Sequence, residues 1–152
     1  MSKVASILNY GGVLFAGETE ENLSHYHTGM MRIIRAINQE YTFMEPCEVT
    51  CKKAELLMPK QMLINATAKF AHRVVTLHEP EPIYKTIHVP THPRSCQELF
   101  STLKAKTNRR KRCLIIRLPK VYNSIPSCLK LLNPYSFKKK LRTFEIAETP
   151  IT

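Results

Sequence analysis

The stretch MLINATAKF, residues 62–70, decides which fold class the sequence predicts. Apolar side chains recur at every second position of this stretch, and Asn65, Thr67 and Lys69 stand between them. Successive side chains of a β-strand point to opposite faces, so the alternation predicts a strand with one buried face. A sheet is therefore expected in the core of the protein.

Other segments have the apolar character of strands and lie between turn or proline signals. Residues 4–10 and 13–16 flank the pair Gly11-Gly12, which predicts a short hairpin or a bent strand. The remaining strand candidates are residues 47–51, 74–77, 83–89 and 113–118, the last of them ended by Pro119.

Helical patterns lie between these strands. Apolar residues from Leu23 to Tyr41 recur every three or four positions, which predicts a long amphipathic helix with Thr19 as its N-cap. The sequence SCQE at residues 95–98 matches a capping box and predicts a second helix that continues to about Lys106. Residues 127–132 are expected to form one or two helical turns.

Together these elements predict an α+β fold, as a single compact domain with a mostly antiparallel sheet, one long helix and one short helix. Residues 1–122 would form the globular domain, and residues 123–152 a C-terminal extension with a short helix and a basic tail. From Pro134 onward the tail is expected to be mobile, with weak structure of its own.

Positive charge is concentrated in the last third of the chain. The protein has 152 residues and a net charge of +11. Residues 1–98 contain ten Lys/Arg and ten Glu, whereas residues 99–144 contain thirteen Lys/Arg and no acidic residue. Such an asymmetry between two parts of one chain favours a polyanionic partner.

The sequence has few features of an enzyme. It contains no aspartate, the usual ligand for catalytic magnesium and the usual third member of hydrolase triads. It also lacks a phosphate-binding loop, a dinucleotide fingerprint, a zinc-protease motif and a nucleophile elbow. We therefore predict that the protein is not an enzyme, and a small enzyme with an unrecognised Cys/His site is the third interpretation.

Two pairs of residues are candidate metal ligands, namely Cys47 with Cys51 and His88 with His92. Positions four apart in an extended segment lie about 13 Å apart at ~3.3 Å per residue, whereas zinc ligands must converge on one ion. We therefore expect no metal and no cofactor. The five cysteines form no regular framework, which predicts free thiols in a reducing compartment, cytoplasmic or nuclear.

The sequence also predicts that the protein neither spans a membrane nor is secreted. No apolar run reaches the length of a transmembrane helix. The apolar N-terminus resembles a signal peptide only superficially, because Asn9, Tyr10 and the Gly11-Gly12 pair interrupt it.

Two basic clusters contain the candidate binding residues. The first lies between the helix predicted to end near Lys106 and the strand at 113–118, so both neighbours would hold it in place. The second lies among aromatic residues, a combination that suits unpaired bases and equally suits the headgroup level of a membrane. The candidate polyanion-binding residues are Lys104, Lys106, Arg109, Arg110, Lys111, Arg112, Lys138, Lys139, Lys140 and Arg142, and the candidate stacking or membrane-interface residues are Tyr135, Phe137 and Phe144.

The size, the basic charge and the predicted order of strand, long helix, strands, short helix and basic strand resemble the small matrix and accessory proteins of negative-strand RNA viruses. That resemblance implies an α+β domain that binds nucleocapsid and the inner face of a membrane. No PPxY or PTAP-type budding signal is present, and no functional residue is assigned from the resemblance.

These observations predict a non-enzymatic protein that binds RNA or ribonucleoprotein, with anionic lipid headgroups as a second ligand. Self-association is a further expectation, and no small-molecule substrate is expected. The alternative is a nuclear protein-interaction or regulatory factor whose basic runs serve only as import signals.

Overall fold

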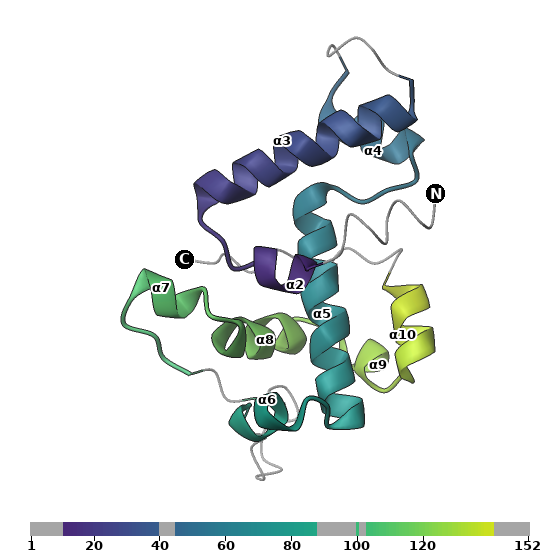
Figure 1. Ribbon diagram of the computed structural model, residues 1–152. Helices are drawn as coiled ribbons and strands as arrows, with labels where there is room; N and C mark the ends of the chain where they lie inside the picture. The colour runs from purple at the N-terminus through teal and green to yellow at the C-terminus, as the bar shows by residue number, and fades with distance from the viewer. Residues whose placement is uncertain (1–10, 40–44, 88–99, 101–102, 142–152) are drawn as a thin grey trace. The chain divides into compact units, whose positions relative to one another are not determined.

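The computed structural model describes residues 11–39, 45–87, 100 and 103–141, and every element within these residues is a helix (Figure 1). The predicted α+β fold with an antiparallel sheet is therefore wrong. The chain divides into two compact units, Met1–Leu63 and Ile64–Thr152, which we call the N-terminal unit and the C-terminal unit. The division falls within helix α5, Pro59–Leu77.

The N-terminal unit contains α2 (Gly12–Phe15), α3 (Glu20–Ile37) and α4 (Cys47–Lys53). The predicted long helix is confirmed as α3. Its predicted N-cap is also confirmed, because Thr19 Oγ1 accepts a hydrogen bond from the backbone N–H of Asn22 at 3.3 Å. The hairpin expected around Gly11-Gly12 is wrong for residues 12–15, which form α2, and residues 4–10 lie outside the described part of the chain.

Helices α3 and α4 pack against each other through a small apolar core (Figure 1). The side-chain amide of Asn38, which follows α3, donates a hydrogen bond to the carbonyl of Thr50 in α4 at 2.9 Å. The strand predicted at residues 47–51 is wrong. Glu48 stands in the first turn of α4 and Lys52 and Lys53 in its last turn, which is the charge order that the helix dipole favours. The buried members of this core are Met31, Ile34, Cys51 and Ala54.

The stretch MLINATAKF lies within α5, so the strand predicted there is wrong, as is its continuation at 74–77. Buried residues of α5 in the C-terminal unit recur at spacings of three and four, as they do on one broad face of a helix. Polar residues belong to this face: the side-chain amide of Asn65 donates to the carbonyl of Leu141 at 3.1 Å. The buried residues are Asn65, Thr67, Ala68, Ala71, His72 and Val74.

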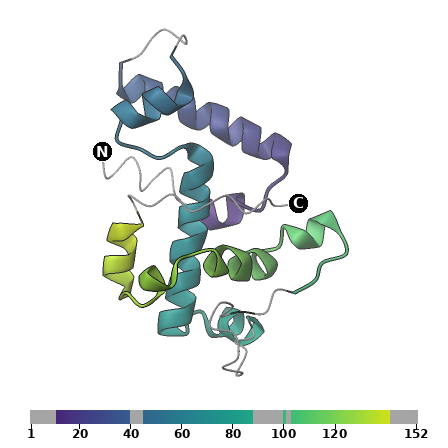
Figure 2. The ribbon, with the colours of Figure 1, turned by 180° about the vertical axis from the view of Figure 1, so that it is seen from behind.

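The other helices of the C-terminal unit are α6 (Glu81–Thr86), α7 (Asn108–Lys111), α8 (Leu114–Asn123), α9 (Ser127–Lys130) and α10 (Pro134–Lys140), shown from behind in Figure 2. The helical turns expected at 127–132 are confirmed by α9. The strand predicted at 83–89 is wrong for residues 83–86, which belong to α6.

Two further predictions near the basic stretch need correction. The strand at 113–118 is wrong, because α8 begins at Leu114 and contains Pro119 in its interior. Residues 116–119, Val121 and Tyr122 are all buried, so this helix forms part of the core of the unit. The helix expected from the capping box does not extend through residues 103–106, which are not helical, and residues 95–99 lie outside the described part of the chain.

The mobile tail expected from Pro134 onward is wrong for residues 134–141. Asn133 Oδ1 caps α10 by accepting a hydrogen bond from the N–H of Ser136 at 2.8 Å. Phe137 and Leu141 are buried in the core of the C-terminal unit, and the ring of Phe137 stacks on His72 with the ring centroids 3.9 Å apart. Burial lowers the pKa of His72, while the backbone groups of Lys130 and Leu132 act in the opposite direction. Residues 142–152 lie outside the described part of the chain.

Candidate nucleic-acid interface

The division into two units coincides with a division of charge. The N-terminal unit contains six Lys/Arg and seven Glu, for a net charge of −1. The C-terminal unit contains seventeen Lys/Arg and five Glu, for a net charge of +12. The whole positive excess of the protein therefore belongs to the unit that contains both predicted basic clusters.

The first basic cluster is formed by Lys104, Lys106 and Arg109–Arg112, and we call it the α7 cluster. Thr107 caps α7, because its Oγ1 accepts a hydrogen bond from the N–H of Arg110 at 3.3 Å. The sequence predicts that a helix ending near Lys106 and a strand at 113–118 hold this segment, but other parts of the chain flank it in the structure. On one side Phe100 is buried in the core, and on the other side α8 begins immediately and is buried along most of its length.

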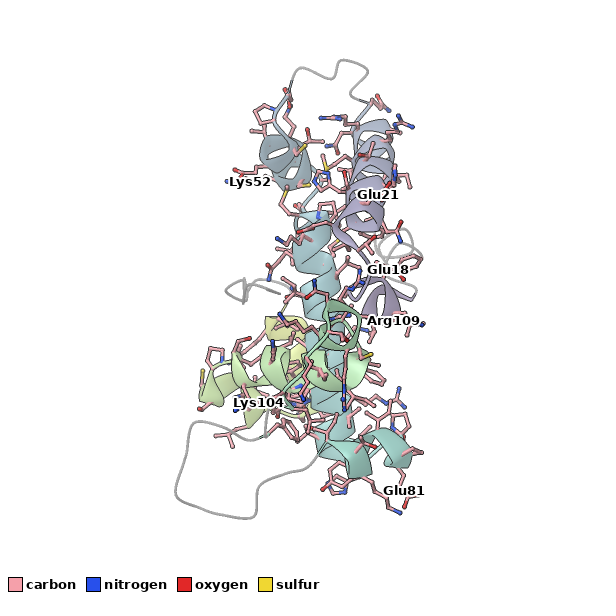
Figure 3. The ribbon with its side chains drawn as sticks, turned by 90° about the vertical axis from the view of Figure 1, so that its left-hand side faces the viewer. Glu18, Glu21, Lys52, Glu81, Lys104 and Arg109 are labelled. Carbon is pink, nitrogen blue, oxygen red and sulfur yellow. The ribbon has the colours of Figure 1, made fainter. Side chains whose placement is uncertain are left out.

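The side chains of the α7 cluster lie at the surface, and Lys104 and Arg109 are labelled in Figure 3. Lys104, Lys106, Arg109 and Arg110 are exposed, and Lys111 and Arg112 are partly exposed. Within the described residues, none of these six forms an ion pair, whereas cations elsewhere in the unit do. Each cluster cation is therefore available to an external anion without the loss of an internal carboxylate partner.

The second basic cluster is formed by Lys138, Lys139 and Lys140 on α10, and we call it the α10 cluster. All three lysines are exposed. Tyr135 is 79 % exposed and precedes Lys138 and Lys139 by three and four residues, so its ring shares their side of the helix. Phe137 is 1 % exposed and belongs to the core instead of the surface. Arg142 and Phe144 lie outside the described residues.

The two clusters do not form one continuous patch. Within the C-terminal unit, α7 lies at one side and α10 at the other, with α8 between them, in both opposite views (Figures 1 and 2). A ligand that contacts both clusters must therefore span the distance between them.

Two other cations of the basic third have structural roles that the sequence did not predict. Arg117 is 4 % exposed, and its Nη2 donates a hydrogen bond to Thr67 Oγ1 at 3.2 Å. Lys130 lies over the ring of Tyr122, with Nζ 5.2 Å from the ring centroid, and donates to the carbonyl of Asn123 at 3.3 Å. Burial lowers the pKa of both groups, that of Arg117 to about 10. The helical spacing of α8 would have identified Arg117 as buried.

The candidate metal ligands are placed differently from the prediction. Cys47 and Cys51 share one face of α4, so the distance argument based on a strand is wrong for this pair. Cys51 is buried with its Sγ 3.7 Å from Met31 Sδ, and burial is the main cause that raises the pKa of its thiol. His88 and His92 lie outside the described residues, within which no group of three or more potential metal ligands occurs. Cys47, Cys51, Cys113 and Cys128 are free thiols.

Comparison with known proteins gives no assignment: no family model matches the chain, and no curated protein and no solved structure matches it. Among the described helices, none is both long enough and apolar enough to span a lipid bilayer. The function must therefore be argued from the residues themselves.

Proposed function

We propose that this protein is a non-enzymatic basic binding protein whose C-terminal unit binds single-stranded RNA or ribonucleoprotein, as a viral matrix or accessory protein does. The observation that carries the proposal is the α7 cluster, in which six surface cations without a described carboxylate partner lie between the buried Phe100 and the buried face of α8. A cationic segment anchored at both ends loses little conformational entropy on binding. Phosphate groups along a nucleic acid are its natural ligands.

The second cluster supports a single strand over a duplex. The exposed ring of Tyr135 beside Lys138 and Lys139 pairs a stacking surface with phosphate-binding cations. Unpaired bases stack on such rings at about 1–3 kcal/mol per base, whereas bases inside a duplex are not accessible.

The placement of the clusters favours RNA over a membrane as the main ligand. Helices α7 and α10 lie apart within the unit, on either side of α8, so a ligand that uses both clusters has to span the distance between them (Figures 1 and 2). A flexible strand can span that distance and contact both. Preferential binding to vesicles that contain phosphatidylserine, with no binding to RNA, would contradict the proposal.

The first prediction concerns salt. With six to eight phosphate contacts on a single strand, the log–log slope of affinity against salt concentration should be about −4 to −6, at roughly −0.7 per contact. Titration of a fluorescently labelled oligoribonucleotide at several sodium chloride concentrations measures this slope. A slope shallower than about −2 would mean that the clusters do not act as a phosphate-binding surface.

The second prediction concerns the α7 cluster. Replacement of Arg109, Arg110, Lys111 and Arg112 by Gln should weaken RNA binding at least tenfold, or about 1.4 kcal/mol. Folding should change little, because exposed charges away from special contacts contribute within about 0.5 kcal/mol. The α10 cluster also belongs to a folded helix and not to a mobile tail, since residues 134–140 are helical. Its triple Gln variant should therefore also weaken binding, roughly in proportion to the charges removed.

A matched control separates local contacts from net charge. The double variant Arg109→Gln/Arg110→Gln and the double variant Arg73→Gln/Lys85→Gln remove the same charge from the same unit. Arg73 and Lys85 already pair with Glu79 and Glu81, at 3.5 Å and 2.6 Å. The first variant should therefore bind RNA more weakly than the second. Equal losses would show that only net charge matters, and normal RNA binding with loss of nuclear entry would support the import alternative.

A further inference from the structure

Sulfur-bearing side chains are concentrated in the small core between α3 and α4. This core consists of four buried residues and three partly buried ones, and four of these seven residues carry sulfur. The whole chain has five cysteines and six methionines among 152 residues, so composition alone does not explain this concentration. The sulfur-bearing members of the core are Met31, Cys47, Cys51 and Met58.

Two of these sulfur atoms are in direct contact. Cys51 Sγ, on α4, lies 3.7 Å from Met31 Sδ, on α3, and both residues are 2 % exposed. If both atoms bond one ion at about 2.3 Å, the length of a zinc–sulfur bond, this separation corresponds to an angle of about 107° at the metal. Because that angle is close to the tetrahedral value, one ion fits between the two sulfur atoms without a change in their separation.

Cys47 provides a second thiol beside this pair. It lies four residues before Cys51 on the same face of α4, where Cβ atoms are about 5–6 Å apart, so both thiols can reach one ion. Its Sγ is turned toward α3 and lies 4.0 Å from Nη2 of Arg35. The separation of about 13 Å that argued against a metal at these two cysteines applies to a strand and not to this helix.

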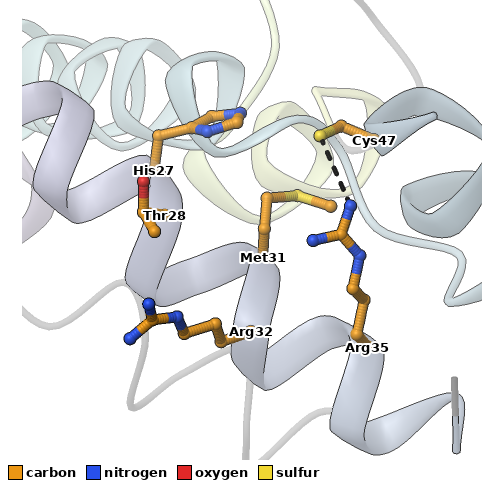
Figure 4. A pocket seen from close by; sticks show the side chains of 6 residues that line it. All are labelled: His27, Thr28, Met31, Arg32, Arg35 and Cys47. Carbon is orange, nitrogen blue, oxygen red and sulfur yellow. Dashed lines mark hydrogen bonds between the residues drawn. The ribbon is translucent and has the colours of Figure 1, made fainter. Parts of the chain in front are cut away.

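A pocket of about 320 Å³ leads from the surface to this part of the core (Figure 4). Met31 extends into the pocket from α3, and Cys47 extends into it from α4 (Figure 4). Exposed residues such as Arg32 line the pocket together with the buried Met31, so an ion can reach the sulfur ligands from solvent. The lining residues are His27, Thr28, Met31, Arg32, Arg35 and Cys47.

We propose that Met31, Cys47 and Cys51 bind a copper ion in its monovalent state. Thiolate and thioether are the soft ligands that select copper(I), whereas structural zinc sites use four ligands drawn from Cys, His, Asp and Glu. Among the described residues, no group of three His, Cys, Asp or Glu side chains could hold a metal, which disfavours zinc. Copper(I) accepts fewer ligands, and here the thioether supplies the third.

Binding of the ion involves proton release and no redox step. Each thiol loses its proton as its sulfur bonds the metal, so two thiolates and one thioether surround a single positive charge. Because the ligands come from both α3 and α4, the ion also links the two helices of the N-terminal unit. This site is independent of the RNA proposal, and it departs from the expectation that the protein binds no metal.

Competition with a coloured copper(I) chelator tests the site. The protein keeps its full length, and Cys96, Cys113 and Cys128 are replaced by Ser, so that Cys47 and Cys51 are the only thiols that remain. Added under anaerobic, reducing conditions to the copper(I)–bicinchoninate complex, this protein should withdraw one copper ion per chain. Excess zinc should not displace the copper, and X-ray absorption at the copper edge should show sulfur ligands only.

A matched pair of methionine variants distinguishes this site from a sulfur-rich core in general. Met31→Leu removes the thioether beside Cys51 but conserves volume, so the fold should be retained. Its affinity for copper(I) should fall about tenfold or more, since loss of a group that merely orients a metal ligand already costs that much. Met58→Leu alters another methionine of the same core and should leave the affinity unchanged. Far-UV circular dichroism verifies that both variants are folded.

Any of three results would overturn the proposal. The first is failure of the protein to withdraw copper from bicinchoninate, which would identify the contact between Cys51 and Met31 as ordinary core packing. The second is an affinity that Met31→Leu leaves unchanged or lowers no more than Met58→Leu does. The third is an unchanged affinity in Cys47→Ser, because this variant lacks one of the two proposed thiolates and should bind copper(I) much more weakly.

Discussion

Replacement of Phe137 by Ala should destabilise the C-terminal unit by about 3–5 kcal/mol, the usual cost of removing a buried Phe side chain. Phe137 is 1 % exposed, and its ring stacks on His72, which is itself buried. Loss of the ring would leave a cavity between α5 and α10. In a unit of this size the melting temperature should fall by more than about 10 °C. Far-UV circular dichroism during thermal and urea unfolding measures both quantities.

Tyr135→Ala is the matched control for this prediction. Tyr135 stands two residues earlier on the same helix, and its side chain is 79 % exposed, so its removal should change stability by less than about 0.5 kcal/mol. The same variant should weaken RNA binding, because its ring is the proposed stacking surface. Equal and small effects of both substitutions on unfolding would mean that α10 is not part of the folded core.

Replacement of Arg117 by Met should stabilise the protein by about 1–3 kcal/mol, since buried charges are often replaced favourably by apolar side chains of similar volume. Arg117 is 4 % exposed, and its Nε has no hydrogen-bond partner among the described atoms. Burial lowers its pKa to about 10 from 12.5. At neutral pH the guanidinium is charged in both the folded and the unfolded chain, so this shift corresponds to a cost of about 3 kcal/mol for folding.

The neighbouring Thr67 does not reverse this expectation. When Arg117 no longer donates to it, its hydroxyl can still bond to a backbone carbonyl one turn earlier in the helix, as threonines in helices do. Arg117→Lys retains the charge but not the fork, and should be less stable than Arg117→Met. Urea unfolding of the two variants decides the matter. If Arg117→Met proves less stable than the original protein by more than about 1 kcal/mol, the guanidinium has an anionic partner that outweighs its desolvation.

The long helix α3 was predictable because its sequence signals agree with one another. Thr19 is an N-cap residue, Glu20 and Glu21 stand in the first turn, and the apolar residues that follow have one period. The local sequence signals and the tertiary packing favour the same helix in this segment, so the prediction from sequence agrees with the structure.

The strand at 62–70 was mispredicted because two of its polar residues are buried. Asn65 and Thr67 were assigned to a solvent-facing side, but Asn65 bonds to the carbonyl of Leu141 and Thr67 to Arg117, partners 76 and 50 residues away. If Asn65 and Thr67 are counted as exposed, the buried positions of the stretch recur every second residue, as in a strand. If they are counted as buried, the buried positions form one face of a helix. The sequence of the stretch itself does not contain this information.

The candidate binding residues were predictable where they depend on charge alone. The α7 cluster and the lysines of α10 are at the surface, as a run of cations usually is. Phe137 and Arg117 were not predictable by residue type, because each depends on which face of a helix it occupies. The pocket lined by His27, Met31, Arg35 and Cys47 follows from the helical spacing of the first three on α3, but only once the segment at Cys47 is known to be a helix and not a strand (Figure 4).

The junction between α7 and α8 joins two segments that tolerate mutation very differently. Under the proposed function, the requirement in Arg109–Arg112 is charge at the surface, so Lys and Arg could exchange and change order without loss of phosphate binding. In the next turns, from Ile116 to Tyr122, the requirement is shape inside a packed core, where even one methylene is felt. Among related proteins, the sequence of residues 109–112 should therefore vary while its positive charge is conserved. The sequence of the adjoining helix α8 should itself be conserved.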